Sequence, residues 1–359
     1  MVITKLHCLV KLLKLREPYS ISYESVDKFE NVFLHIATRE GYNGWGCAAP
    51  VKSITGESVE DVLEAFTGTI EPLLKGEDIF RYAYLLETLK NKIPDRPAAL
   101  AMVDMALHDI LSQKAGVPLF KLLGSYRLSI PTSITIGIMP TAAALSYAKI
   151  HIEKGFTILK IKGGKDVSED IEKINLIRET VGRKIKLRFD ANQGYSVEDS
   201  IKFIKGTRHA AIELIEQPTP KDQLDQLALI SSQTSVPVMA DESLHSLKDA
   251  FHLSKNHYTD LINIKLMKAG GIMEGLHVNS VAKAAGINAM VGCMDESALG
   301  IAAGLHMALS RPNIKYADLD GHLDVVNDPF EGLIRIEKGV LIPPESIGLG
   351  WIGMNPVKC

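Results

Sequence analysis

Charged residues end a series of short, otherwise apolar segments in the second part of the 359-residue chain. If these segments are buried strands, each terminal charge is costly unless it meets a partner or a ligand. One such residue alone is most simply explained by a salt bridge, but six segments ending in the same way indicate one functional site. The residues are Lys160 and Lys162, Asp190, Glu216, Asp241 and Glu242, Lys265, and Asp318 and Asp320.

Three of these residues are carboxylates on successive segments, namely Asp190, Glu216 and Asp241. Mg²⁺ prefers octahedral coordination by oxygen and keeps positions for water or substrate, so this set suits a magnesium ion. No His or Cys stands at these segment ends, which argues against Zn²⁺. We therefore expect a hard divalent cation held by the three carboxylates.

Lysines flank the carboxylates, with Lys160 and Lys162 on one side and Lys265 on the other. The two-residue period of a strand points Lys160 and Lys162 to the same face. A lysine is a useful base only if its pKa is lowered, and burial and neighbouring cations lower it. A cation between opposed lysines suits the removal of a weakly acidic proton next to a carboxylate. The cation holds the carboxylate and neutralises the charge that forms, while a lysine takes the proton.

The elements that position these residues are eight short β-branched segments, each followed by a helical pattern. This alternation predicts parallel strands joined by right-handed crossovers. We expect an α/β fold with a modified (β/α)8 barrel, whose active site lies at the carboxyl ends of the strands. An open doubly wound sheet is the structural alternative. The segments are residues 129–137, 156–163, 184–190, 211–218, 236–241, 261–266, 287–292 and 314–320.

The remaining chain predicts a second, smaller unit. Residues 1–125 have an α+β pattern, with strands at 2–13 and 29–38, turns at the glycines around Trp45, and helices from residue 58 to about 122. The helix that begins near Arg96 is expected to be amphipathic. We place the barrel at residues 126–320. Residues 321–359 are irregular and rich in proline, and we expect them to return to the N-terminal capping domain.

Composition gives no sign of a nucleic-acid or membrane partner. The chain is 46% hydrophobic and 23% charged, with a formal net charge of −3. This balance gives no long-range attraction to nucleic acid or to an anionic membrane. The four cysteines form no Cys-x-x-Cys pair, and lysines interrupt the apolar N-terminus. We therefore expect a reduced cytoplasmic protein without a signal peptide or a membrane span.

The motifs together resemble the enolase superfamily, muconate lactonizing enzyme subgroup, over essentially the whole chain. The resemblance rests on the Lys-x-Lys pair at 160–162, Asp-Ala-Asn at 190–192, Glu-Gln-Pro at 216–218, Asp-Glu-Ser at 241–243, and residues 263–271. It implies a Mg²⁺ ion, one per subunit, and a Lys base. Lys162 and Lys265 would be the two acid/base residues, and Lys160 would give electrostatic support.

Within this subgroup, Asp318 and Asp320 resemble the Asp-x-Asp pair of dipeptide epimerases, which binds the α-ammonium group of the substrate. Two carboxylates at the end of the eighth strand would attract a cation and repel a dicarboxylate. The alternative is that one of them caps a turn. Asn192 and Glu242 could be outer-shell partners of the metal ligands, although strand alternation would turn Glu242 away from Asp241.

Two loops are expected to read the substrate side chains. One is the polar segment from Arg16 to Asp27, and the other follows the seventh strand and contains Met294 and Asp295. Relatives acting on Ala-Glu resemble one another in having a basic residue in the first loop, where this chain has Glu24. The acidic pair Glu24 and Asp295 favours cationic or neutral dipeptides, unless Glu24 faces solvent and Arg16 reads the side chain.

The sequence thus predicts a dipeptide epimerase that inverts the α-carbon of the C-terminal residue of an L-Xaa-Xaa dipeptide through an enolate. The expected partner is the small-molecule dipeptide, in a homo-oligomer. The alternatives within the superfamily are an o-succinylbenzoate synthase, an N-succinylamino acid racemase and a muconate-type cycloisomerase. A barrel that binds ligands without catalysis is the alternative from another class.

Overall fold

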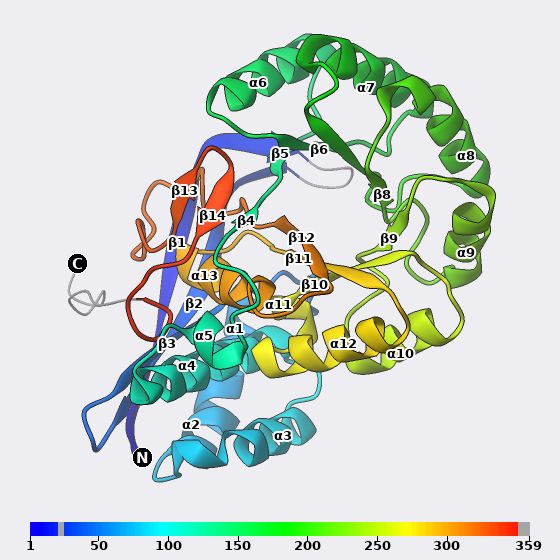
Figure 1. The fold of residues 1–359 in the computed structure, drawn as a ribbon. Helices are drawn as coiled ribbons and strands as arrows, with labels where there is room; N and C mark the ends of the chain where they lie inside the picture. Colours follow the sequence, from blue (N-terminus) through cyan, green and yellow to red (C-terminus); the bar gives the residue numbers. More distant parts are fainter. Residues whose placement is uncertain (21–24, 351–359) are drawn as a thin grey trace.

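The computed structural model describes residues 1–20 and 25–350. An antiparallel sheet with several helices lies beside a larger barrel of strands surrounded by helices (Figure 1). Within the described part of the chain, no helix is long and apolar enough to cross a membrane.

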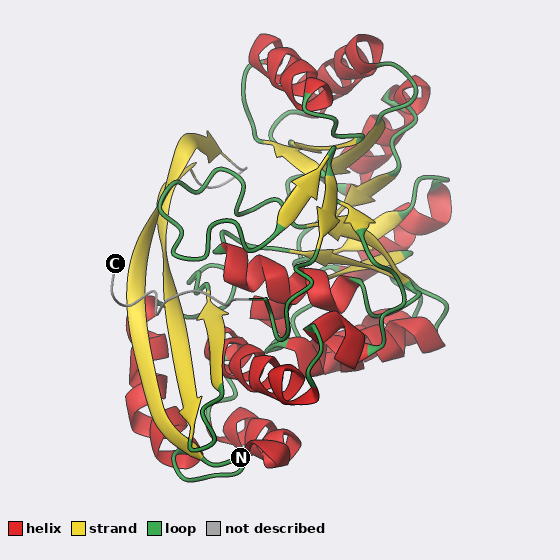
Figure 2. Cartoon of the chain, turned by 60° about the vertical axis from the view of Figure 1, so that its left-hand side comes forward, coloured by secondary structure: helices red, strands yellow, loops and turns green. Residues whose placement is uncertain are grey.

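The N-terminal sheet has the order β1 (Ile3–Ser20), β2 (Ser25–Thr38) and β3 (Asn43–Ala48), and all of its pairs are antiparallel (Figure 2). The sequence prediction missed β3 and placed turns there. Gly44 and Gly46 are not turn residues, because both lie within β3. A side chain at either position would collide with the backbone of the helix that crosses the sheet. These glycines allow a close approach between helix and strand.

The crossing helix is α4 (Pro97–Ala115), which packs against β2 and β3 on one side and against barrel helices on the other. It ends at Gly116, whose φ of 71° is left-handed, as the helix-stop pattern predicted. The expectation of an amphipathic helix is wrong, since nearly every residue from Ala98 to Ile110 is buried. A helix that is buried on all sides suits a place between two layers. Its buried carboxylates accept backbone hydrogen bonds from these layers, Asp104 from Ile272 and Asp109 from Trp45. The other cap helices are α1 (Val59–Ala65), α2 (Glu71–Leu74), α3 (Tyr82–Lys92) and α5 (Leu119–Leu123).

The larger sheet confirms the predicted barrel. Its eight strands are parallel and follow one another in chain order. A bridge between Thr132 and Ala317 joins the first strand region to the last, which rules out the open doubly wound alternative. The strands are β5 (Ile134–Ile136), β6 (Ile158–Lys162), β7 (Lys186–Asp190), β8 (Leu214–Glu216), β9 (Val238–Ala240), β10 (Leu261–Lys265), β11 (Asn288–Gly292) and β12 (Ile314–Asp318).

Helices surround this barrel on the outside (Figure 1). They are α6 (Thr141–Glu153), α7 (Val167–Val181), α8 (Val197–Gly206), α9 (Leu224–Gln233), α10 (Leu247–Lys255), α11 (Leu266–Ala269), α12 (Ile272–Ala284) and α13 (Ala298–Ala308). Several begin with a Ser or Asp whose side chain accepts a backbone N–H, as Asp166 does for α7 and Ser246 for α10. Such N-cap residues accept hydrogen bonds from backbone N–H groups of the first helical turn, which have no partner within the helix.

The chain after the barrel contacts both units. Phe330 packs its ring 5.2 Å from Phe33 and 5.6 Å from Trp45, measured between ring centroids. Two short strands, β13 (Arg335–Glu337) and β14 (Val340–Ile342), form a small antiparallel sheet with β4 (Ile130–Pro131). Residues 351–359 lie outside the described part, and the domain limits at 125 and 320 stay predictions.

Candidate active site

A cavity of about 190 Å³ lies at the carboxyl ends of the barrel strands, where the cap faces them. The cap contributes Leu15, Glu17 and Pro18 from β1 and Val26 from β2. The barrel contributes most of the residues that the sequence singled out. Those lining the cavity are Lys160, Lys162, Asn192, Asp241, Glu242, Lys265, Met294, Asp295, Asp318 and Asp320.

The lysines reach this cavity from opposite sides of the barrel. Lys162 ends β6 and Lys265 ends β10. In the sheet, β7, β8 and β9 separate these two strands. Those three strands are the ones that lead to Asp190, Glu216 and Asp241. The arrangement therefore places carboxylates between two lysines that approach from different directions.

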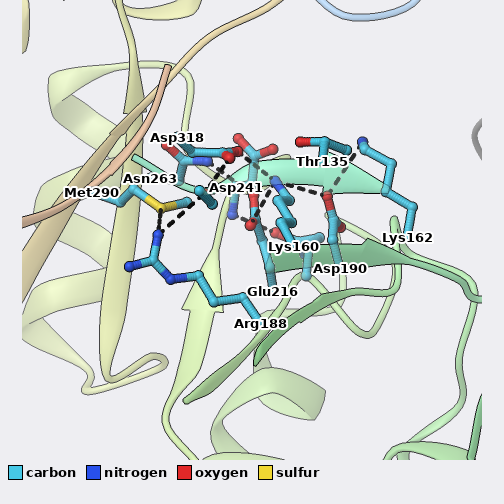
Figure 3. Close-up of polar contacts among 12 residues, drawn as sticks. Thr135, Lys160, Lys162, Arg188, Asp190, Glu216, Asp241, Asn263, Met290 and Asp318 are labelled. Carbon is cyan, nitrogen blue, oxygen red and sulfur yellow. Dashed lines mark hydrogen bonds and ion pairs between the residues drawn. The ribbon is translucent and has the colours of Figure 1, made fainter. Parts of the chain in front are cut away.

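Lys160 lies within a cluster of carboxylates (Figure 3). Its Nζ is 3.1 Å from Asp190 Oδ2, 2.9 Å from Glu216 Oε2 and 2.8 Å from Asp318 Oδ2. Burial by itself would lower the pKa of Lys160, but the carboxylates outweigh burial and raise that pKa well above its ordinary value. Lys160 therefore stays charged, which suits the electrostatic role expected for it.

Two lysines hold the two oxygens of Asp241. Lys265 Nζ lies 2.8 Å from Oδ2, and Lys268 Nζ lies 2.6 Å from Oδ1 and also donates to the backbone carbonyl of Asp241. Burial would lower the pKa of Lys265, but Asp241 outweighs it and raises that pKa. The pKa of Lys265 is therefore not lowered by its surroundings in this arrangement, contrary to the sequence expectation. A cation bound to Asp241 would weaken this attraction.

The three carboxylates fit a magnesium ion by their chemistry. All are almost fully buried, and within the described residues Asp190 Oδ2 and Glu216 Oε2 accept no hydrogen bond. Both oxygens lie instead beside the ammonium group of Lys160. Among the described residues, no group of three His, Cys, Asp or Glu side chains is gathered closely enough to hold a metal ion. Oxygen ligands are those that Mg²⁺ prefers, and a divalent cation would offset the negative charge of three buried carboxylates.

Asn192 and Glu242 both line the cavity, beside Lys162. The expectation that strand alternation turns Glu242 away from Asp241 is wrong. Strand β9 ends at Ala240, and Asp241 and Glu242 lie in the turn that follows. Successive side chains need not point to opposite faces there, as they do in a strand. Asn192 Nδ2 donates to Glu242 Oε1 at 3.2 Å, and Lys162 Nζ donates to Asn192 Oδ1 at 3.2 Å.

Asp318 and Asp320 face the same cavity, but their surroundings differ. Asp318 accepts from Ser133 Oγ at 2.6 Å and from Lys160. Asp320 Oδ2 accepts from the backbone N–H of Thr135 at 2.7 Å, and Oδ1 lies 4.0 Å from Cys293 Sγ. Burial and the nearby Asp318 raise the pKa of Asp320 to about 6. A positive group placed at Asp320 would relieve this repulsion.

The predicted specificity residues are only partly described. Met294 and Asp295 line the cavity, whereas Glu24 lies outside the described residues. Arg16, the alternative reader, is exposed and is absent from the described lining. Two further acids of the lining were not named from the sequence. Glu17 lies within the predicted segment from Arg16 to Asp27, whereas nothing in the sequence pointed to Asp324.

Sequence reasoning also gave no role to Lys268, although it stands in the motif at 263–271. Lys268 is buried in α11 directly after β10. A second lysine three residues after a predicted active-site lysine, within the same motif, was the available signal.

Comparison with known proteins assigns the family. Residues 3–124 match the family described as mandelate racemase/muconate lactonizing enzyme, N-terminal domain, and residues 143–352 match the one described as enolase C-terminal domain-like. A relative from Desulforapulum autotrophicum, named L-Lys-D/L-Arg epimerase, is 42% identical over 94% of this chain and 96% of that protein. A relative from Bacillus subtilis, named L-Ala-D/L-Glu epimerase, is 38% identical over 96% of this chain and 95% of that protein.

A solved structure agrees with these sequence matches. It is the dipeptide epimerase from Methylococcus capsulatus, complexed with Mg and the dipeptide L-Arg-D-Lys. It has a TM-score of 0.92 and 37% identity, over 98% of this chain and 99% of that one. The chain therefore belongs to the mandelate racemase/muconate lactonizing enzyme family of the enolase superfamily, which confirms the resemblance of its motifs.

Proposed function

We propose that the chain is a Mg²⁺-dependent dipeptide epimerase, which inverts the α-carbon of the C-terminal residue of an L-Xaa-Xaa dipeptide. The isomerase class is shared by the related epimerases, and the finer statement rests on one observation. Lys162 and Lys265 enter one cavity from β6 and β10, with the carboxylates on the three intervening strands. This is the arrangement that proton removal on one face and proton return on the other requires.

The reaction needs a neutral lysine on one face of the α-carbon and a protonated lysine on the other. The neutral Nζ takes the α-proton, so that a C–H bond breaks, an N–H bond forms and the substrate becomes an enolate. The protonated Nζ on the opposite face then returns a proton to carbon. When bound, Mg²⁺ supplies positive charge beside the substrate carboxylate, where negative charge develops. Lys160 adds a fixed positive charge to the same region.

The experiment that tests this proposal is α-deuteration in deuterated water with Mg²⁺. L-Ala-L-Lys and L-Ala-L-Glu are suitable first substrates, followed by a dipeptide library. Incorporation of deuterium with inversion of the second residue supports the epimerase. Incorporation only into N-succinylamino acids would favour the racemase alternative, and no incorporation into any compound would favour a barrel that only binds ligands.

Asp320 is the clearer test of the substrate-ammonium site, because Asp318 also holds Lys160. We expect Asp320→Asn to lower kcat/KM for a free L,L-dipeptide by roughly 10- to 150-fold. The loss corresponds to one charge-assisted hydrogen bond in a partly dry site, ~1.5–3 kcal/mol. An N-acetylated dipeptide has no ammonium group, so it should lose less. The measurement is kcat/KM for both compounds with both enzymes.

The wild-type enzyme provides the matching control. It should discriminate against the acetylated dipeptide, because Asp320 then meets no substrate cation, whereas Asp318 still pairs with Lys160. If the wild type uses free and N-acylated substrates equally well, the ammonium site does not exist, and the N-succinylamino acid racemase reading takes precedence.

We further propose a preference for cationic or neutral side chains over Ala-Glu. In the described lining, Glu17 lies in β1 of the cap, and Asp295 and Asp324 lie in barrel loops that touch the cap. Asn31 of β2 donates to the backbone carbonyl of Asp295, and the backbone N–H of Arg16 donates to that of Asp324. The lysines of the lining are on the barrel side, and each of them pairs with a carboxylate there, namely Lys160, Lys162, Lys265 and Lys268. An anionic side chain that approaches the cap would therefore meet like charge, whereas a cationic one would meet opposite charge.

This preference predicts that the wild type has a higher kcat/KM for L-Ala-L-Lys than for L-Ala-L-Glu. Asp295→Asn and Glu17→Gln should each shrink that ratio by roughly fivefold, because a partly exposed ion pair contributes ~1 kcal/mol or less. Asp27→Asn is the matched control, since Asp27 is exposed in the same cap segment and is absent from the described lining. A ratio that neither variant changes would show that these acids do not read the side chain.

A further inference from the structure

The two proposed bases differ in how their side chains are held. Lys265 lies 2.8 Å from Asp241, and Lys268 fixes the other oxygen of the same carboxylate. Lys162 has no contact that short. Its Nζ is 3.4 Å from Asp190 Oδ2 and 3.2 Å from Asn192 Oδ1, although its side chain is about as exposed as that of Lys265, 16% against 13%. Lys162 is therefore the looser of the two bases.

Asn192 supplies the shortest polar contact of Lys162, and the turn around Asn192 is built to present it. The backbone N–H of Asn192 donates to Asp190 Oδ1 at 3.0 Å. The φ of Asn192 is 43°, in the left-handed region that asparagine tolerates better than most residues. This conformation sets the amide directly after β7, next to the end of β6. The side chain is 6% exposed, so it is fixed by the protein rather than by solvent.

Glu242 determines which end of the amide faces the lysine. An asparagine amide has one accepting end and one donating end. Asn192 Nδ2 donates to Glu242 Oε1, so Oδ1 is left to accept from Lys162. Glu242 is itself 8% exposed, and its Oε2 accepts no hydrogen bond from the residues that the structure describes. The hydrogen bond of this buried carboxylate to Asn192 therefore fixes the orientation of the amide.

We propose that Asn192 and Glu242 form a positioning arm for Lys162 and leave Lys265 unaffected. The arm joins the turn after β7 to the turn after β9, and it restrains a flexible four-carbon side chain at the face of the substrate that Lys162 serves. Restraint matters because a misplacement of about 1 Å can cost ~10²-fold in rate. The inference rests on the proposed two-base function, and it adds a role for these residues to the expectation that they are outer-shell partners of the metal ligands.

The test measures initial rates of α-proton exchange for each diastereomer separately, L-Ala-L-Lys and L-Ala-D-Lys, with the full-length Mg²⁺-loaded enzyme in deuterated water. Lys162→Ala and Lys265→Ala first establish which diastereomer depends on which lysine. Asn192→Gly is the main variant, because glycine accepts the left-handed backbone whereas alanine would add strain. Glu242→Met removes the acceptor that orients the amide, and Glu242→Gln keeps an oxygen in the same place.

We expect Asn192→Gly to lower kcat for exchange roughly 10- to 100-fold on the diastereomer that Lys162→Ala abolishes, and by less than about threefold on the other. Glu242→Met should affect the same diastereomer, and Glu242→Gln should lose less than Glu242→Met. A merely structural role, or a role in metal binding, would slow both diastereomers alike. That result, or a larger loss on the Lys265 diastereomer, would overturn the proposal.

Failure of the proposed function has a different signature. In that case the wild type itself exchanges the α-proton of neither diastereomer, and the proposed positioning role is wrong as well. If Asn192→Gly does not fold, Glu242→Met and Glu242→Gln still decide the question, because Glu242 lies in another turn.

Discussion

Lys162→Ala and Lys265→Ala should each abolish epimerization, the largest effect expected for any single substitution in this protein. Each removes the group that takes or returns the proton on one face, and general acid–base catalysis contributes ~10²- to 10⁴-fold. Inversion needs both faces, so neither variant should convert one diastereomer into the other. Each should still exchange the α-proton of one diastereomer with solvent, and the two variants should retain opposite diastereomers. The measurement combines the rate of inversion with deuterium incorporation.

Lys165→Ala is the matched control for these variants. Lys165 follows β6 on the same rim of the barrel, but it is exposed and absent from the described lining of the cavity. It should epimerize at close to the wild-type rate. Normal epimerization by either Lys162→Ala or Lys265→Ala would show that the two-base mechanism is wrong.

Removal of the metal should have the second largest effect. Excess EDTA should abolish turnover, and added Mg²⁺ should restore it. Asp190→Asn, Glu216→Gln and Asp241→Asn should each lower activity by at least ~10²-fold, because loss of one ligand weakens the stabilisation of developing charge by several kcal/mol. Calorimetric titration with Mg²⁺ would show weaker binding in the same three variants, independently of turnover.

Asp222→Asn serves as the control for the metal ligands. Asp222 is an exposed carboxylate in the loop after β8, away from the described lining. It should keep both Mg²⁺ affinity and activity. Full activity of the wild type in excess EDTA would contradict the metal assignment while leaving the lysine prediction open to its own test.

The barrel could be predicted because its signal is local and repeated. Each β-branched segment followed by a helical pattern predicts one parallel strand, and eight such units in succession favour a closed barrel. The cap was harder to predict. The sequence prediction placed turns at Gly44 and Gly46. Glycine is common both in turns and in strands that a helix crosses closely, so the sequence does not distinguish the two cases. The contact with α4, distant in sequence, decides between them.

Sequence by itself determined which charged residues end the barrel strands, because a strand end can be located from its own residues. It also determined that they would meet, since all parallel strands of a barrel end on one rim. The tertiary structure alone decided how their charges pair. Lys160 contacts carboxylates from three strands, and Asp241 is shared between Lys265 and Lys268. Such pairing depends on distances between side chains on different strands, which no local pattern encodes.

The surroundings of Lys162 show the same limit most clearly. Sequence placed Asn192 and Glu242 beside the predicted metal ligands, and extended the strand period across Asp241 and Glu242. Strand β9 instead ends one residue earlier, so Glu242 turns toward Asn192 and the amide toward Lys162. A strand's last residue is set by its hydrogen bonds to neighbouring strands, and those partners lie elsewhere in the chain. Residue identity therefore specified the chemistry available at this site, and long-range packing specified which atoms face one another.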